Sequence, residues 1–206
     1  MNDKIIIAIG RQFGSGGREI GKKLADALKI AYYDKELLAV AAKESGLNRE
    51  VFEKADEQTS SMLTYALSMG VAYFGSPMPE NNFMTREGIF KIQSDTILGL
   101  AERESCVIVG RCADYILRDN PSMISFFISD TIPNRILRVV NSLNVSVEEA
   151  REQLAKIDKS RAAYYNYYTD KKWGAASSYH LCIDVSLLGV DRTVAYLKQF
   201  VEEVGV

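Results

Sequence analysis

Residues 4–28, KIIIAIGRQFGSGGREIGKKLADAL, predict a buried strand, a glycine-rich turn and an amphipathic helix in immediate succession. The apolar run over 5–9 is rich in β-branched residues, as is typical of a strand covered on both faces of a parallel sheet. Glycines then crowd positions 10–17, and apolar residues recur at helical spacing over 20–28. A helix start offers N–H groups, and glycines let the backbone curl around an anion. The stretch therefore predicts a phosphate-binding loop.

The turn departs from the usual phosphate-loop signature G-x-x-x-x-G-K-[ST]. If Gly16 is the second glycine of that signature, Arg11 stands in place of the first glycine, Gly17 replaces the lysine and Arg18 replaces the hydroxyl residue. No other register restores the lysine. The alternative interpretation of the same glycines is a tight strand-to-helix connection that binds nothing.

Length and composition predict one α/β domain over 1–206 that is not built to bind nucleic acid. The chain has 206 residues and a formal net charge of −2, whereas a nucleic-acid surface needs a basic excess. Cys106, Cys112 and Cys182 have neither a disulfide pattern nor a zinc spacing, which favours reduced thiols. Neither a signal peptide nor an apolar run of membrane-spanning length is recognisable, so we expect a cytoplasmic protein with no membrane partner.

Strand and helix patterns alternate along the rest of the chain, as in a parallel α/β fold. Further strands are predicted over 30–33, 106–109, 123–128 and 179–184. Helices are predicted over 35–45, from 48 onward, over 62–74 and over 85–104, with a loop over 75–82. Because no strand interrupts 48–104, this segment is expected to be a helical insertion that covers a substrate or forms a homo-oligomer contact.

The last third of the chain has its own helix signals. Pro133 lies near the start of a helix, and Ser146 with Glu149 forms a capping box for a long helix. Asp191 is expected to cap the final helix. His180, the only histidine, has no obvious nucleophile near it in the sequence and is expected to be structural.

Two polar residues follow predicted strands, where open α/β sheets bind their ligands. Arg111 comes directly after the strand over 106–109 and Gly110, and its guanidinium suits a phosphate. Asp34 follows the strand over 30–33, although a simple N-cap of the next helix explains it equally well. Arg135 and Arg138 lie on a later helix and point either toward a nucleotide or toward water.

Four motifs, IGRQFGSGGREIGKKLA, YYDKELL, CVIVGRCADYIL and IDKSR, resemble the bacterial cytidylate kinase-like family, and the resemblance extends over the whole chain. That family is similar to the cytidylate kinases and to P-loop nucleoside monophosphate kinases in general. The resemblance implies a three-layer P-loop NTPase fold with a five-stranded parallel sheet and flanking helices. It also implies ATP phosphates at the first turn, Mg²⁺, a monophosphate acceptor under the insertion and a lid region over 146–178.

The resemblance also implies roles for individual residues. Gly14, Ser15 and Gly16 match the glycine-serine-glycine of the family's phosphate loop, which Gly17 and Arg18 continue. Substrate-binding positions are matched by Asp34, Arg111, Asp158 and Arg161. The departures are Gly17 for the loop lysine, Arg18 for the magnesium-binding hydroxyl, Cys112 for an aspartate, and Val40 and Leu154 for two arginines.

These matches predict a phosphotransferase that moves the γ-phosphoryl group of ATP to CMP or a related nucleoside monophosphate. Arg18 would steady the donor phosphates, Arg111 would anchor the acceptor and Arg161 would neutralise charge from the lid. Asp34 would orient the acceptor or hold metal-bound water. Two alternatives stay open: a nucleotide- or anion-binding protein that has lost catalysis, and a kinase whose small-molecule acceptor is not a nucleotide.

Overall fold

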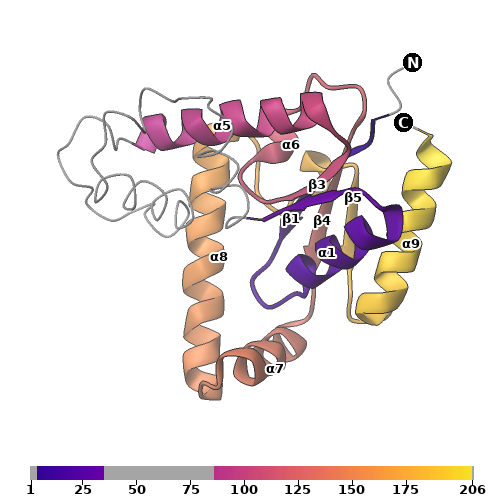
Figure 1. Cartoon of the computed structure of the whole chain (residues 1–206). Helices are drawn as coiled ribbons and strands as arrows, with labels where there is room; N and C mark the ends of the chain where they lie inside the picture. The colour runs from indigo at the N-terminus through magenta and orange to yellow at the C-terminus, as the bar shows by residue number, and fades with distance from the viewer. Residues whose placement is uncertain (1–3, 35–85, 206) are drawn as a thin grey trace, which may run out of the picture.

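Five parallel strands form a single sheet in the order β2-β3-β1-β4-β5 (Figure 1). The computed structural model describes residues 4–34 and 86–205. The strands are β1 (Ile6–Arg11), β2 (Ala31–Tyr33), β3 (Cys106–Val109), β4 (Met123–Ser129) and β5 (Leu181–Asp184). The central strand β1 pairs with β3 on one side and with β4 on the other, with Ile6 opposite both Cys106 and Met123. The carboxyl end of β1 and the loop after it are therefore bordered by the ends of two other strands.

Helices cover both faces of the sheet, which gives three layers (Figure 1). They are α1 (Gly17–Leu28), α5 (Arg86–Arg103), α6 (Ala113–Ile116), α7 (Ile132–Leu143), α8 (Val147–Thr169) and α9 (Gly189–Val204). Alternate residues of β1 separate the two cores, because successive side chains of a strand point to opposite faces. Ile7 and Ile9 pack with α1 and α9, whereas Ile6 and Ala8 pack with α5 and α6. The predicted fold class is confirmed.

The long helix α8 runs alongside the sheet and packs on α7 near its N-terminal end (Figure 1). An apolar contact among Ile136, Val139, Ala150 and Leu154 joins the two helices, and Phe13 of the glycine-rich loop packs against it. The predicted capping box is confirmed: the Ser146 hydroxyl accepts from the Glu149 N–H, and the Glu149 carboxylate accepts from the Ser146 N–H. The loop thus touches both helices that follow β4.

Two predicted boundaries need correction. The helix α9 begins at Gly189 with Leu188 as its N-cap, so the prediction that Asp191 caps it is wrong. Asp191 lies in the first turn instead, where its carboxylate accepts from Lys23 Nζ at 2.7 Å. The last strand begins at Leu181 and not at 179, because the N–H of Tyr179 donates to Ala176 in a 3-10 turn over Ala176–Ser178.

Several sequence predictions fall outside the part of the chain that the structure describes. They are the helices over 35–45, from 48 and over 62–74, and the loop over 75–82. The insertion predicted over 48–104 is described only from residue 86, where α5 matches the helix expected over 85–104. Within residues 4–34 and 86–205, no helix combines the length and the apolarity needed to cross a bilayer.

Candidate active site

The glycine-rich loop between β1 and α1 is shaped by two glycines with left-handed backbone conformations. Gly14 has φ 74° and Gly16, the N-cap of α1, has φ 80°. A Cβ atom on Gly14 would lie 2.8 Å from the backbone oxygen of Arg135, so the loop passes too close to α7 for any side chain. The buried Ser15 hydroxyl donates to the Gln12 carbonyl at 2.9 Å and closes the turn. Gly16, the N-cap of α1, has no side chain with which to cap the helix, and the N-terminus of a helix favours an anion through its backbone N–H groups.

Asp158 of α8 and Arg135 of α7 contact the backbone of the glycine-rich loop. One carboxylate oxygen of Asp158 accepts from the Phe13 N–H at 2.8 Å, and the other pairs with the Arg135 guanidinium. Arg135 Nε donates to the Phe13 carbonyl at 2.7 Å. Both backbone groups of Phe13 are therefore satisfied by side chains of later helices. Asp158, which the family resemblance assigns to a substrate-binding lid, contacts the loop itself in this structure.

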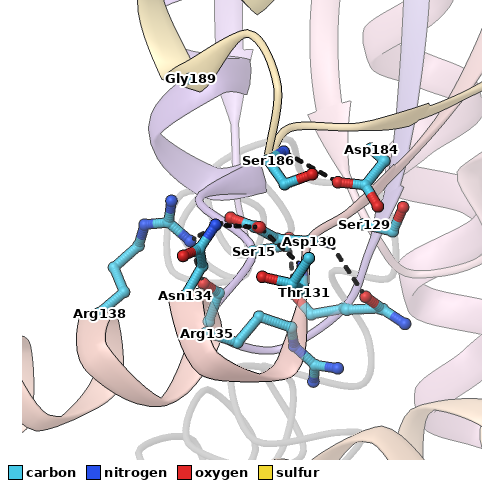
Figure 2. A network of polar contacts seen from close by, with 12 residues as sticks. Ser15, Ser129, Asp130, Thr131, Asn134, Arg135, Arg138, Asp184, Ser186 and Gly189 are labelled. Atoms are coloured by element: carbon cyan, nitrogen blue, oxygen red, sulfur yellow. Dashed lines mark hydrogen bonds and ion pairs between the residues drawn. The ribbon is translucent and has the colours of Figure 1, made fainter.

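A second set of polar contacts fixes the β4 side of the loop (Figure 2). Asp130, at the end of β4, accepts from the Thr131 N–H and from Asn134, and it pairs with Arg138 at 3.0 Å. Arg138 also donates to the carbonyl of Gly14. Arg138 therefore supports the loop, and the sequence alternatives for it, nucleotide or water, both missed this contact.

A cavity opens at the carboxyl ends of β1 and β3, beside the loop. Three arginines from three different elements line it: Arg11 ends β1, Arg111 follows β3 and Arg161 lies on α8. A carboxylate and an aromatic wall complete the lining, namely Asp114, Tyr164, Tyr165, Trp173 and Tyr179. This is the edge at which parallel α/β sheets bind their ligands, and a concentration of guanidinium groups there favours a phosphate.

The turn that carries Arg111 is strained. Gly110, Arg111 and Cys112 have successive φ values of 82°, 63° and 55°, all left-handed. Each of the two non-glycine residues costs about 1–2 kcal/mol in this conformation. The turn directs Arg111, which is 6% exposed, into the cavity wall. Strained backbone conformations cluster at functional sites, so this turn independently indicates a functional site at this edge of the sheet.

The three arginines oppose one another electrostatically. Burial, followed by the charges of Arg161 and Arg111, holds the pKa of Arg11 well below its ordinary value. Burial also lowers the pKa of Arg161 to about 10, with Arg111 contributing in the same direction against the opposing effect of Asp158. Arg161 Nη1 donates to the Arg11 carbonyl at 3.1 Å, which keeps the two residues adjacent. Three cations held together at the wall of one cavity make a site for an anion of more than one charge.

Asp114 brings a buried carboxyl group into the same cavity. The Tyr165 hydroxyl donates to its Oδ2 at 2.7 Å, and burial raises the pKa of Asp114 above its ordinary value. Burial likewise raises the pKa of the neighbouring Cys112 thiol, although Arg111 acts in the opposite direction. Cys112 is therefore a thiol and not a reactive thiolate at neutral pH.

The raised pKa of Asp114 predicts a specific pH dependence of stability. Between the ordinary aspartate pKa of about 3.9 and its own, the folded protein holds a proton that the unfolded chain has lost, so ionisation of Asp114 opposes folding as pH rises. We expect the difference in free energy of unfolding between Asp114→Asn and the wild type to shift in favour of the variant from pH 4 to pH 8. Urea unfolding at several pH values measures this difference, and parallel curves for the two proteins would contradict it.

Arg18 and Asp34, two of the predicted site residues, pair with each other. Arg18 Nε donates to Asp34 Oδ2 at 2.8 Å, and Arg18 Nη2 forms an ion pair with the same oxygen at 2.6 Å. The Arg18 side chain is 66% exposed, whereas that of Asp34 is 6% exposed. Arg18 thus lies in the first turn of α1 and does not line the arginine cavity. Its role at the donor phosphates, and that of Asp34 at the acceptor, stay predictions.

Sequence reasoning found part of this site. Arg111 and Arg161, predicted from the strand end and from the family resemblance, do meet in one cavity. Arg11, Asp114 and the aromatic wall were missed. Arg11 had the same signal as Arg111, an arginine at the carboxyl end of a buried strand, but it was considered only as a misfit in the loop signature. His180 is structural as expected, since its Nδ1 accepts from the Ser125 N–H at 3.0 Å.

The sheet order, the glycine loop and the cationic edge beside it define a P-loop kinase-like fold. Solved structures agree: a shikimate kinase from Bacteroides thetaiotaomicron is 15% identical with a TM-score of 0.53, covering 96% of this chain and 98% of that one. A gluconokinase from Sinorhizobium meliloti 1021 is 13% identical with a TM-score of 0.51, covering 99% and 97%. A model of the cytidylate kinase-like family matches residues 6–187, and the chain belongs to this family.

A more similar solved structure is that of an uncharacterized protein from Eubacterium ventriosum ATCC 27560. It is 33% identical to this chain, with a TM-score of 0.74, and the match covers 97% of this chain and 99% of that one. Comparison with curated proteins gives no significant match. Family and fold together make this protein a kinase-like phosphotransferase.

Proposed function

We propose that this protein transfers the γ-phosphoryl group of ATP to CMP or a related nucleoside monophosphate, with Mg²⁺ as cofactor. The observation that carries the proposal is the cavity beside the glycine loop, in which Arg11, Arg111 and Arg161 converge. Phosphoryl transfer requires positioning and charge stabilisation more than covalent chemistry, and arginines that surround the transferred group supply both.

The donor phosphates would bind at the loop. Gly14 and Gly16 leave the backbone free of side chains there, and the first N–H groups of α1 add partial positive charge. Mg²⁺ would neutralise the donor phosphates, and phosphates with water supply most of its ligands in such sites. Asp34, whose Oδ2 accepts from Arg18 in the first turn of α1, would orient the acceptor or hold metal-bound water. Among the residues that the structure describes, no cluster of three acidic, histidine or cysteine residues forms a separate metal site.

The acceptor would bind in the arginine cavity. Arg111 would hold its monophosphate, and Arg161 would neutralise charge that develops between donor and acceptor. Tyr164, Trp173 and Tyr179 present aromatic surface beside these cations, which suits an acceptor that carries a ring. The donor that we propose, ATP, is a cytoplasmic metabolite, which fits the location expected from the sequence.

An ADP-release assay with a panel of acceptors tests the proposal. We expect CMP or another nucleoside monophosphate to give the highest kcat/KM in the presence of ATP and Mg²⁺. Arg151→Met is the control for substitutions of the cavity arginines, because Arg151 is exposed on α8 and far along the helix from Arg161. Turnover of a non-phosphorylated small molecule alone would favour the kinase with a different acceptor. Folded protein that binds ATP but turns over no acceptor would overturn the proposal in favour of a binding protein.

A further inference from the structure

The side chain of Arg11 crosses the position where the phosphate-loop lysine is missing. Arg11 is the last residue of β1, and Gly17 is the first residue of α1, where the usual signature has its lysine. A Cβ atom built on Gly17 would lie 2.6 Å from the Cβ of Arg11 and 3.0 Å from its Cγ. A side chain at position 17 would therefore overlap the beginning of the Arg11 side chain, which cannot swing away as a flexible end can. Arg11 and a lysine at position 17 exclude each other.

The guanidinium end of Arg11 lies at the end of β3. A Cβ atom on Gly110 would overlap Arg11 Nη1 and would lie 3.0 Å from Arg11 Cζ. The side chain therefore runs from the central strand, across Gly17, to the strand that carries Arg111. This path places its charge between the loop and the cavity, and two glycines, one at each end of the path, leave room for it.

The surroundings of Arg11 are those of a ligand-binding cation. Arg161 and Arg111 both repel its charge and lower its pKa, and Asp34 opposes them with a smaller effect. In a salt bridge that served stability alone, a carboxylate would affect the pKa of Arg11 more strongly than two other guanidinium groups do. The cluster is costly in the absence of an anion and favourable in its presence.

The geometry points to Arg11 as the cation that binds the transferring phosphoryl group in place of the loop lysine. This inference rests on the proposed function and adds a residue to it. Glycine is then required at position 17 to leave room for the Arg11 side chain, and it does not indicate a phosphate loop that has lost its function. The cation is thus carried by the last residue of β1 and not by the first residue of α1. A guanidinium there can contact two phosphoryl oxygens at once.

Arg11→Met and Arg11→Lys test the role of the charge. With Mg²⁺ present, calorimetry measures the affinities for ADP and for AMP-PNP, which differ by the terminal phosphoryl group. We expect Arg11→Met to lower kcat about 100-fold and to weaken AMP-PNP binding about tenfold more than ADP binding. Arg11→Lys should fall between this variant and the wild type. Arg192→Met, at an exposed position of α9, is the matched control and should stay within twofold of the wild type.

The outcomes separate this inference from the proposed function. If the wild-type protein turns over no acceptor, the proposed function is overturned. The ratio of its affinity for AMP-PNP to its affinity for ADP, compared with the same ratio for Arg11→Met, still decides the role of Arg11. An unchanged ratio overturns the inference whether or not kcat falls. Wild-type protein that binds neither nucleotide overturns both. Thermal unfolding shows which variants are folded. If Arg11→Met does not fold, the same affinity comparison is made with Arg11→Lys.

A double-mutant cycle tests the steric part. Gly17→Ala should lower the urea midpoint of the wild type, and in an Arg11→Gly background it should lower the midpoint by less than half as much, because the overlapping atoms are gone. Gly17→Lys in the wild type should lose activity, whereas a merely degraded loop would gain it. Equal midpoint shifts in the two backgrounds, or a gain in kcat for Gly17→Lys, would overturn the inference.

Discussion

Arg111→Met should reduce kcat/KM for the phosphate acceptor about 10³-fold, the largest effect that we expect on activity. Arg111 is buried, and its strained left-handed backbone directs it into the cavity. Its position is therefore fixed before any ligand arrives. Steady-state kinetics with the best acceptor of the panel measures the loss.

A loss of folding does not explain this expected loss of activity. Arg111 lowers the pKa of both Arg11 and Arg161, so its removal relieves repulsion between like charges. The midpoint temperature of thermal unfolding of Arg111→Met should therefore lie within a few degrees of the wild-type value. Arg111→Lys, which keeps the charge but not the fork of donors, should recover only part of the activity. Wild-type kcat/KM in Arg111→Met would remove Arg111 from the site.

Gly14→Ala should destabilise the fold by about 3 kcal/mol, the largest effect that we expect on stability from one methyl group. About 1–2 kcal/mol comes from the left-handed φ of 74°. The remainder comes from the backbone oxygen of Arg135, which lies 2.8 Å from the position of the new Cβ and cannot move without displacing α7. Urea unfolding measures the change.

Gly189→Ala is a matched control for this variant. Gly189 also has a left-handed φ, of 70°, but a Cβ atom there meets nothing within 4 Å. It should therefore show only the conformational cost, about 1–2 kcal/mol. The difference between the two alanine variants isolates the close approach of the loop to α7. Equal losses in the two variants would mean that the loop can shift away from α7 freely.

The sheet was predictable from sequence because its strands are apolar runs that end at glycine or polar residues. The buried pattern of β1 and the Gly110–Arg111 pair gave both the central strand and one arginine of the cavity. Sequence alone gives the position of a residue along its strand, but not the direction in which a long side chain runs beyond the strand end. The path of Arg11 across Gly17 is a tertiary fact of this kind.

Helix ends show the same limit. Aspartate is a good N-cap, which is why Asp191 was expected to begin the last helix. Its carboxylate instead pairs with Lys23, which is 168 residues away in sequence, and the N-cap is Leu188, three residues earlier. In contrast, the Ser146–Glu149 capping box is a local interaction within four residues, and it was predicted correctly. Interactions that close over short sequence distances are readable from the sequence, whereas pairings between distant elements are not.

The contact between Asp158 and Phe13 has a consequence for the order of folding. The two residues are 145 positions apart, and both neighbours of β1 lie beyond residue 105. Loop closure over such distances is slow, and domains assemble as their later segments leave the ribosome. We therefore expect the glycine-rich loop to reach its final shape only after α8 has been synthesised, although the loop itself is among the first segments made.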